Sequence, residues 1–242
     1  MWYNVMNGVM NMAVGNRVYL KRPMISDELL NEFKGIPAAN VADCMGRLSA
    51  LYPRISLKSA PKQPVTVGRA LTVKTRGGDN LMIHKALNIA EPGDVIMVSN
   101  DGGSEYRALM GEIMFGYAMY KQIAGVVIDG PIRDSDAVAT MNLPVYANGT
   151  NPAGPYKNGT GEINTPIACG GISVNPGDLI VMDQDGVIVV PWQDAAEIID
   201  SAKKLQAVDA ENVHAALTGT ADRQWIEDQL KEQGTEIIDG QY

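Results

Sequence analysis

The sequence predicts a mixed α/β protein with helical additions at both ends. From about residue 38 to residue 191, short apolar runs typical of buried strands alternate with segments whose apolar residues recur at helical spacing. Two Pro-Gly-Asp turns, at residues 92–94 and 176–178, each precede such an apolar run. We therefore divide the chain into an N-terminal arm and helix (1–37), a central α/β domain (38–191) and C-terminal helices (192–242) that we expect to pack on a neighbouring subunit.

The elements of the first half follow from caps, breakers and periodicity. Residues 1–22 carry little pattern and suit either a partner-covering arm or a frayed terminus. Ser26 is a suitable N-cap for a helix that Gly35 and Pro37 end, and a second helix begins near Ala39. The next predicted elements are a strand at 65–74, a helix at 80–90, a strand at 95–98, a helix at about 105–120 with Ser104 as its cap, and a strand from 125.

The helix at about 105–120 has two interpretations. Leu109, Ile113 and Tyr117 recur at fourfold spacing, which favours one long helix with Gly111 at a close packing contact. Alternatively the helix begins again at Gly111, because a glycine costs about 1 kcal/mol inside a helix and is tolerated at a break. That second arrangement would leave free main-chain amides at Ile113 and Met114, and the local sequence does not decide between the two.

The second half of the sequence predicts strands followed by helices. The segment 148–162 is rich in Gly, Asn, Pro and Thr, so we expect a long loop of the kind that often carries function. Asp185-Gly186 predicts a hairpin turn. The remaining elements are strands at 143–147, 172–174, 179–182 and 187–190 and helices at about 194–217 and 221–231, with Thr220 a suitable cap for the last.

The chemistry of the chain is most visible where an apolar strand from Gly125 gives way to Arg133 and Asp134. Gly130 and Pro131 are expected to end this strand, which leaves the two charges on a loop. Arginine can hold a planar carboxylate through two parallel hydrogen bonds, and aspartate can hold a hard divalent cation. The pair therefore suits a metal-assisted site for an acidic substrate. Taken alone, the dipeptide favours a solvated surface ion pair, because adjacent opposite charges are common on surfaces.

Composition excludes several classes of protein. The net charge of −8, without a basic block, argues against nucleic acid as a partner. Cys44 and Cys169 are far apart, and His84 and His214 lack metal-ligand spacing, so neither a disulfide framework nor a zinc site is expected. The N-terminus lacks the pattern of a signal peptide and no apolar run is long enough to span a membrane. We therefore expect a cytoplasmic protein with no membrane partner.

A series of short motifs resembles one family over about residues 35–191. The family is that of the 4-hydroxy-4-methyl-2-oxoglutarate aldolases, whose relatives include the regulator of ribonuclease activity A (RraA-like) proteins. The Gly-Glu helix start and the Gly-x-x-Arg-Asp loop are its most specific part. The matching segments are Ala42-Asp43-Cys44-Met45-Gly46-Arg47, Gly68-Arg69-Ala70, Pro92-Gly93-Asp94, Gly111-Glu112, Gly125 to Gly130, Ile132-Arg133-Asp134, Cys169-Gly170-Gly171, Pro176-Gly177-Asp178 and Asp185-Gly186-Val187.

The resemblance implies a fold, an assembly and an activity. The implied fold is a layered α/β/β/α swivelling arrangement like that of phosphohistidine domains, assembled into homotrimers or homohexamers with sites at subunit boundaries. The implied activity is that of a class II pyruvate aldolase, a lyase that depends on Mg²⁺ or Mn²⁺, cleaves a small 2-keto acid and also decarboxylates oxaloacetate. The alternative is a non-catalytic, protein-binding regulator of ribonuclease activity. A methyltransferase ranks low, because no glycine-rich strand-to-helix loop with an acidic ribose partner is present.

The resemblance also implies roles for individual residues. Asp134 matches the metal-holding aspartate, and Arg133 matches the arginine that binds pyruvate and its enolate. The start of the helix at Gly111, with the amides of Ile113 and Met114, matches the part that holds the substrate carboxylate.

Proton transfer and the remaining metal ligands fall on acidic residues. Glu112 matches an acidic position that activates a water for proton transfer. An acidic residue of a neighbouring subunit's C-terminal helix, Asp209 or Glu211, is a further candidate at the metal. In one respect the chain departs from the family, which usually has an acidic residue where Ala137 stands. Asp136 could substitute if the segment is a loop, but on a helix it would point about 100° away.

Overall fold

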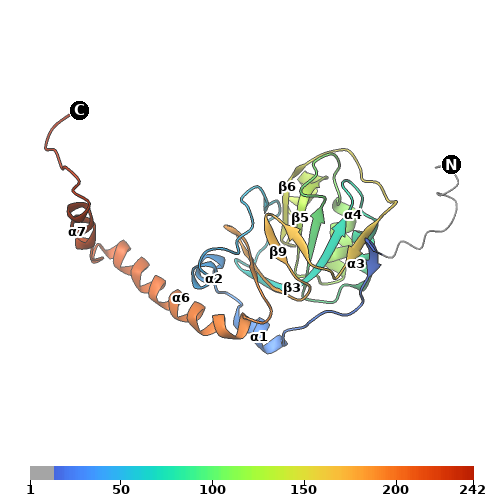
Figure 1. The fold of residues 1–242 in the computed structure, drawn as a ribbon, viewed down its shortest axis with the longest axis horizontal. Helices are drawn as coiled ribbons and strands as arrows, with labels where there is room; N and C mark the ends of the chain where they lie inside the picture. Colours follow the sequence, from blue (N-terminus) through green and yellow to red (C-terminus); the bar gives the residue numbers. More distant parts are fainter. Residues whose placement is uncertain (1–13) are drawn as a thin grey trace. The chain divides into compact units, whose positions relative to one another are not determined.

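The computed structural model describes residues 14–242 (Figure 1). They belong to two compact units, one ending at Ala202 and the other comprising Lys203–Tyr242. The expectation of an arm or frayed end over residues 1–22 lies largely outside the described residues. Within residues 14–242, no helix combines the length and hydrophobicity needed to cross a membrane.

The larger unit is built on parallel strands. β3 (Thr66–Thr75), β4 (Asp94–Asn100), β5 (Gly125–Ile132) and β6 (Val145–Thr150) lie side by side in that order, and each pairs with the next in parallel (Figure 1). Every residue of β4 and β5 is buried. Such continuous burial explains why these strands appear in the sequence as unbroken apolar runs, since parallel strands are usually covered on both faces.

Short strands extend this sheet at both edges. The hairpin of β10 (Leu179–Asp183) and β11 (Gly186–Val190) joins it through an antiparallel pairing of β10 with the first part of β3. The other additions are β7 (Gly161–Ile163) on β3, β1 (Asn16–Val18) on β7 and β2 (Ser56–Leu57) on β6, while β8 (Ile167–Cys169) and β9 (Ile172–Val174) form a separate two-stranded sheet.

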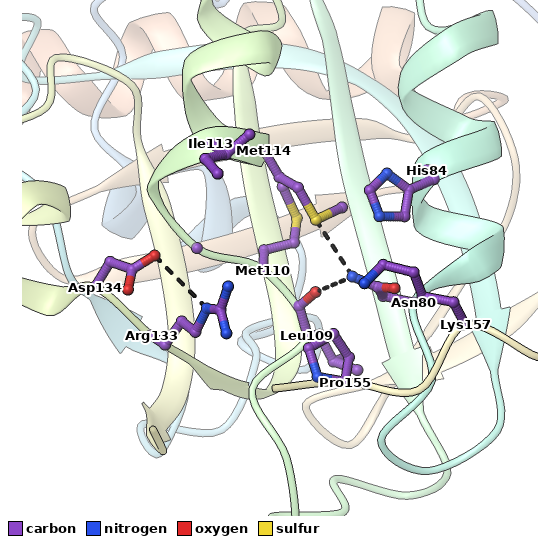
Figure 2. Close-up of a pocket in the computed structure, with 11 residues that line it drawn as sticks. Asn80, His84, Leu109, Met110, Ile113, Met114, Arg133, Asp134, Pro155 and Lys157 are labelled. Atoms are coloured by element: carbon purple, nitrogen blue, oxygen red, sulfur yellow. Dashed lines mark hydrogen bonds and ion pairs between the residues drawn. The ribbon is translucent and has the colours of Figure 1, made fainter. Parts of the chain in front are cut away.

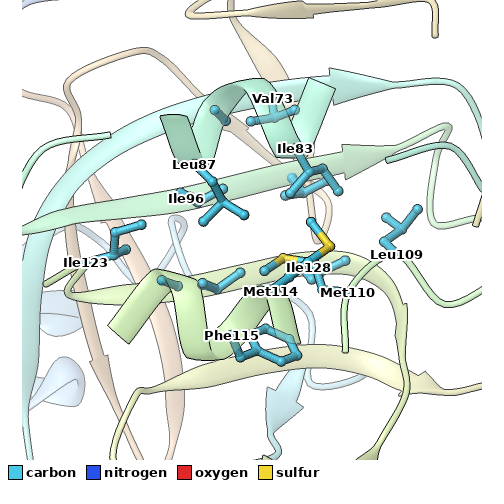
Figure 3. Close-up of a cluster of buried hydrophobic side chains, with 14 of the residues drawn as sticks. Val73, Ile83, Leu87, Ile96, Leu109, Met110, Met114, Phe115, Ile123 and Ile128 are labelled. Carbon is cyan, nitrogen blue, oxygen red and sulfur yellow. The ribbon is translucent and has the colours of Figure 1, made fainter. Parts of the chain in front are cut away.

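Three apolar clusters hold this unit together. The first packs α3 (Leu81–Ile89) and α4 (Glu112–Tyr120) against β3, β4 and β5 (Figure 3). The second packs α1 (Asp27–Glu32), α2 (Ala38–Cys44) and the first turns of α6 (Ala195–Thr218) against β10 and β11. The third joins residues of β3 to β6 with residues of β8 to β11. The mixed α/β class is therefore confirmed, and the finer layered swivelling description stays a prediction.

The helix expected over 105–120 begins only at Glu112, with Gly111 as its N-cap. Ser104 is therefore not a helix cap, and of the two interpretations the start at Gly111 is confirmed. The physical reason is that the preceding segment makes extended main-chain contacts instead of helical ones. The N–H of Ala108 donates to the carbonyl of Ala153 at 2.9 Å, and that of Leu109 to the carbonyl of Pro131 at 3.0 Å.

Two other boundaries also differ from expectation. β5 continues through Gly130 and Pro131 to Ile132, because Gly130 allows a close approach to the side chain of Asn100 and Pro131 still offers its carbonyl. The last helix, α7 (Gln224–Glu232), has Arg223 rather than Thr220 at its N-cap. Thr220 instead belongs to the end of α6, where its N–H donates to the carbonyl of Ala215.

Candidate active site

Arg133 and Asp134 lie directly after β5, beside the start of α4. Two main-chain hydrogen bonds join the end of β5 to the residues that precede α4. Leu109 donates to Pro131, and Arg133 donates to Met110, each at 3.0 Å. This pairing, which we call the seam, brings Gly111 against the arginine and aspartate. It consists of residues 109–110 and 131–133, and its hydrogen bonds use main-chain atoms only.

Gly111 fills a position that admits no side chain. A Cβ atom there would lie 2.3 Å from Oδ2 of Asp134 and 2.9 Å from Cγ of Arg133. The φ angle of Gly111 is −144°, so close approach and not backbone freedom explains the glycine. The next main-chain N–H, that of Glu112, donates to Oδ2 of Asp134 at 2.9 Å.

Asp134 has an uncommon main-chain conformation. Its φ of 59° and ψ of 42° place it in the left-handed region just before α5 (Ser135–Val138). Aspartate is one of the few residues that enter this region readily, and such conformations cluster at functional sites. Nε of Arg133 lies 3.7 Å from Oδ2 of Asp134, and both side chains are about two-fifths exposed, at 42% and 40%. Both side chains are therefore accessible to a ligand, whereas the main chain that carries them is fixed in position.

The amides at the start of α4 are only partly available. Met114 donates to the carbonyl of Gly111 at 3.0 Å, so of the two amides expected to be free this one is engaged within the helix. No partner is found for the Ile113 amide among residues 14–242. The side chain of Ile113 is 85% exposed, whereas that of Met114 is buried. An anion at this helix start would therefore be bound mainly through Ile113 and the helix dipole.

A pocket of about 230 Å³ opens beside the pair (Figure 2). Arg133 and Asp134 lie on one side of it, and Asn80, His84 and Lys157 lie on the other. The sequence analysis did not select these last three residues for the site. The available signals were the spacing of four between Asn80, the N-cap of α3, and His84 in α3, and the position of Lys157 in the long polar loop.

The far side of the pocket is polar and positively charged. Asn80 is 2% exposed, and its Nδ2 donates to the carbonyl of Leu109 at 2.8 Å and contacts Sδ of Met114 at 3.3 Å. Its Oδ1 is buried and has no partner in the part of the chain that the structure describes. Burial, followed by the charge of Lys157, lowers the pKa of His84 below its ordinary value. The imidazole is therefore neutral at pH 7.

The other predicted residues lie outside the lining of this pocket. Glu112 is exposed at the first position of α4, next to Asp134. Asp136 and Ala137 both lie on α5, so the helical alternative holds, and neither residue lines the pocket. Asp209 and Glu211 are exposed on α6 in the second unit, and their role at a neighbouring subunit's metal stays a prediction.

The donor atoms around Asp134 suit a hard divalent cation. Within residues 14–242 no group of three or more His, Cys, Asp or Glu side chains gathers at one point, so a closed protein cage is not present in the described chain. Mg²⁺ does not need one, because it usually keeps several waters and is bound through one or two carboxylates. An exposed carboxylate that accepts a hydrogen bond from the Glu112 amide and packs closely on Gly111 fits that mode of binding.

Comparison with known proteins places this arrangement in a family. Residues 38–189 match the family model described as RraA-like, Aldolase/RraA. The chain belongs to the RraA-like family. The resemblance inferred from its motifs is thereby confirmed, and the RraA-like match contains Gly111, Arg133 and Asp134.

Relatives of this RraA-like protein carry different names. A protein of Halalkalibacterium halodurans, provisionally named 4-hydroxy-4-methyl-2-oxoglutarate aldolase, is 41% identical over 182 residues, which are 75% of this chain and 85% of the relative. The structure of RraAS2 from Streptomyces coelicolor, described as an unusual member of the RNase ES inhibitor RraA protein family, matches with a TM-score of 0.68 at 27% identity, over 78% of this chain and 98% of that one. An uncharacterized protein from Pseudomonas syringae matches with a TM-score of 0.72 at 27% identity, over 83% of this chain and 97% of that one.

Proposed function

We propose that this RraA-like protein is a divalent-metal-dependent class II pyruvate aldolase. In this proposal it cleaves 4-hydroxy-4-methyl-2-oxoglutarate, or a related 2-keto acid, to pyruvate and also decarboxylates oxaloacetate. The observation that carries the proposal is the close packing of Arg133 and Asp134 on Gly111 at the edge of a pocket. The names of relatives such as the 41% identical Halalkalibacterium protein support the aldolase assignment.

In the proposed reaction, Arg133 stabilises the negative charge that develops on the substrate. Cleavage of the C3–C4 bond leaves its electron pair on the three-carbon fragment, which becomes the enolate of pyruvate. The guanidinium of Arg133 offers two parallel N–H donors to the carboxylate or enolate oxygens, and preorganised donors of this kind stabilise charge that develops in the transition state. A Mg²⁺ or Mn²⁺ ion bound at Asp134 would supply Lewis-acid polarisation of the 2-keto oxygen.

Glu112 is the proposed proton-transfer residue. The hydroxyl at C4 must lose its proton as the C4 carbonyl forms, and C3 of the enolate must gain one to give pyruvate. Glu112 is exposed, and its main-chain N–H contacts Asp134, so we propose that its carboxylate exchanges a proton with the substrate through one ordered water. In decarboxylation CO₂ leaves in place of the carbonyl fragment, and only the protonation of C3 remains.

The far side of the pocket suits the second carboxylate of such a substrate. 4-Hydroxy-4-methyl-2-oxoglutarate carries a carboxylate at each end, and the pocket has a cation on each side, Arg133 and Lys157 (Figure 2). Neutral His84 adds a hydrogen-bonding group beside Lys157, whereas Nδ2 of Asn80 is already engaged with Leu109 and Met114. We therefore propose that Lys157 binds the carboxylate distant from the reacting carbons.

The assembly follows the same proposal. We expect a cytoplasmic homotrimer or homohexamer in which Asp209 or Glu211 of one subunit approaches the metal of another. Exposed apolar side chains in the second unit, such as Leu217 and Trp225, support an intersubunit role for this part of the chain. The three apolar clusters support the layered swivelling fold.

Pyruvate release tests the proposal directly. Purified protein is incubated with oxaloacetate or 4-hydroxy-4-methyl-2-oxoglutarate, with added Mg²⁺ or with EDTA, and pyruvate is measured. We expect metal-dependent release that the Arg133→Ala variant loses almost completely. Release that is insensitive to EDTA, or near-wild-type release by the variant, would refute the assignment.

A second candidate function is inhibition of a ribonuclease by protein binding. It is favoured by the likeness to the Streptomyces structure, which is described as belonging to an RNase ES inhibitor family. An assay of RNA cleavage by an RNase E-type enzyme separates the two functions. Inhibition by wild type and Arg133→Ala alike, without pyruvate release by either, would favour the regulator.

A further inference from the structure

We propose that Asp79 is a positioning residue that places Asn80 and Lys157 on the far side of the pocket and so sets the preference for keto acids with a second carboxylate. The inference rests on the proposed function, because Lys157 is the group that would bind this carboxylate. Asp79 itself is 0% exposed and is not among the residues that line the pocket, so it acts through its neighbours.

The carboxylate of Asp79 joins two segments that reach the pocket. Its Oδ2 accepts hydrogen bonds from the main-chain N–H of Asn158 at 2.7 Å and of Gly159 at 3.0 Å. Its Oδ1 accepts from the N–H of Leu81, in the first turn of α3, at 3.0 Å. One buried side chain thus holds both the helix that carries Asn80 and the loop that carries Lys157.

Main-chain pairing fixes the register between these segments. Asp79 and Tyr156 form an isolated parallel bridge. Tyr156 donates to the carbonyl of Gly78 at 2.8 Å, and Asn80 donates to the carbonyl of Tyr156 at 3.0 Å. Lys157 stands between this bridge and the two amides that Asp79 binds, so its backbone is held on both sides.

A cation–π contact holds the other end of the loop. The guanidinium of Arg107 lies 4.1 Å from the ring centroid of Tyr156 and donates to its hydroxyl at 3.0 Å and to the carbonyl of Gly154 at 2.7 Å. Arg107 therefore supports the loop before Lys157, whereas Asp79 supports it after Lys157. Removing the Asp79 carboxylate would leave the residues following Lys157 without their acceptor.

The buried charge of Asp79 suits a positioning role. A carboxylate that accepts three N–H bonds forms charge-assisted hydrogen bonds, which are about twice as strong as neutral ones. Arg76, which is half exposed, lies 3.6 Å from Oδ2 and partly compensates the charge. Substitution of Asp79 should therefore loosen Lys157 without touching Arg133, Asp134 or Gly111.

Ligand affinity measured by calorimetry in the presence of Mg²⁺ tests this inference. The two probes are 2-oxoglutarate, which has a second carboxylate, and pyruvate, which does not. We expect Asp79→Ala and Lys157→Ala each to weaken 2-oxoglutarate binding about tenfold and pyruvate binding less than about twofold. The double variant should lose little more than either single one, because residues that act through one contact are not additive.

A matched control separates positioning from general stability. Asp178 is also a buried carboxylate that accepts two main-chain N–H bonds, from Asn175 at 2.7 Å and Trp192 at 3.1 Å, but it lies away from the pocket. Asp178→Ala should lower thermal stability and leave the ratio of the two affinities unchanged. If Asp79→Ala does not fold, the isosteric Asp79→Asn, which keeps one acceptor, should show a smaller change in the same ratio.

The outcomes distinguish this inference from the proposed function. An unchanged affinity ratio in the Asp79 variants, or strictly additive losses in the double variant, would overturn the positioning role. Failure of the wild type to release pyruvate from any 2-keto acid would overturn the aldolase proposal. The ratio of the affinities for 2-oxoglutarate and pyruvate would still test the positioning role of Asp79.

Discussion

The main-chain N–H of Glu112 donates to Oδ2 of Asp134 at 2.9 Å and ties the first turn of α4 to the residue that begins α5. Glu112 and Asp134 are 22 positions apart in the chain, so neither α4 nor α5 determines this contact alone. The carboxylate is oriented by an amide that would otherwise lack a partner, as the first amides of a helix do.

Gly111→Ala should remove most activity while the protein stays folded. Its Cβ would lie 2.3 Å from Oδ2 of Asp134, which forces the carboxylate away, and a displacement of this size can cost about 10²-fold in rate. Pyruvate release from oxaloacetate is the measurement. Gly116→Ala in the same helix is the matched control, because nothing lies within 4 Å of its Cβ. It should stay active and gain up to about 1 kcal/mol in stability.

Arg133→Lys should lower kcat/KM for keto acids at least tenfold although the charge is kept. Lysine lacks the planar fork that binds a carboxylate through two parallel bonds, and losing a charged hydrogen bond costs about 1.5–3 kcal/mol. The control is Arg17→Lys, since Arg17 is an ion-paired arginine of similar exposure, 39% against 42%. Equal effects of the two substitutions would contradict a specific role for Arg133.

Asp134→Asn should abolish binding of Mn²⁺, which can be followed by electron paramagnetic resonance without any turnover. The amide oxygen of asparagine is a much weaker ligand for a hard cation than a carboxylate is. Asp136→Asn is the control, because Asp136 lies on α5 outside the pocket lining. Mn²⁺ affinity within about twofold of wild type is expected for that variant. A large loss in Asp136→Asn would instead show that Asp136 replaces the missing acidic residue.

Thermal stability should fall as the pH is lowered through the titration range of His84. Burial and Lys157 lower the pKa of His84 in the folded protein, so between that pKa and the unfolded value of about 6.5 the unfolded state binds more protons. The stabilising contribution is present above pH 6.5 and is lost below it. The difference in Tm between wild type and His84→Gln, compared at pH 7.5 and pH 5.5, is the measurement. A difference that grows at the lower pH would contradict the assignment.

Much of the fold could be predicted from the sequence because its parallel strands are buried on both faces. The apolar runs from Val95 and Gly125 correspond to β4 and β5, and the Asp185-Gly186 turn connects β10 to β11. Strands of two or three residues, such as β1, β2, β7 and β8, were not expected. Their pairing is tertiary in origin, and segments this short carry little periodicity.

Only one side of the candidate site could be predicted from the sequence. Arg133 and Asp134 are adjacent and follow a strand, which is a local signal. Asn80, His84 and Lys157 come from a helix and a loop far apart in the chain, and only folding gathers them. The long helix from Glu105 failed for a related reason, because its fourfold spacing was outweighed by the main-chain pairing of the preceding residues with β5.

Under the proposed function, the seam between residues 109–110 and 131–133 bears on how the substrate range of this family can change. Its hydrogen bonds use main-chain atoms, so replacements at Leu109 or Met110 that preserve packing would leave the guanidinium in place. On the far side of the pocket, the polar loop is held by a few side chains. Single substitutions can therefore change it. Substitutions in this loop could thus change which substrates bind, while Arg133 and Asp134 on the other side keep their positions.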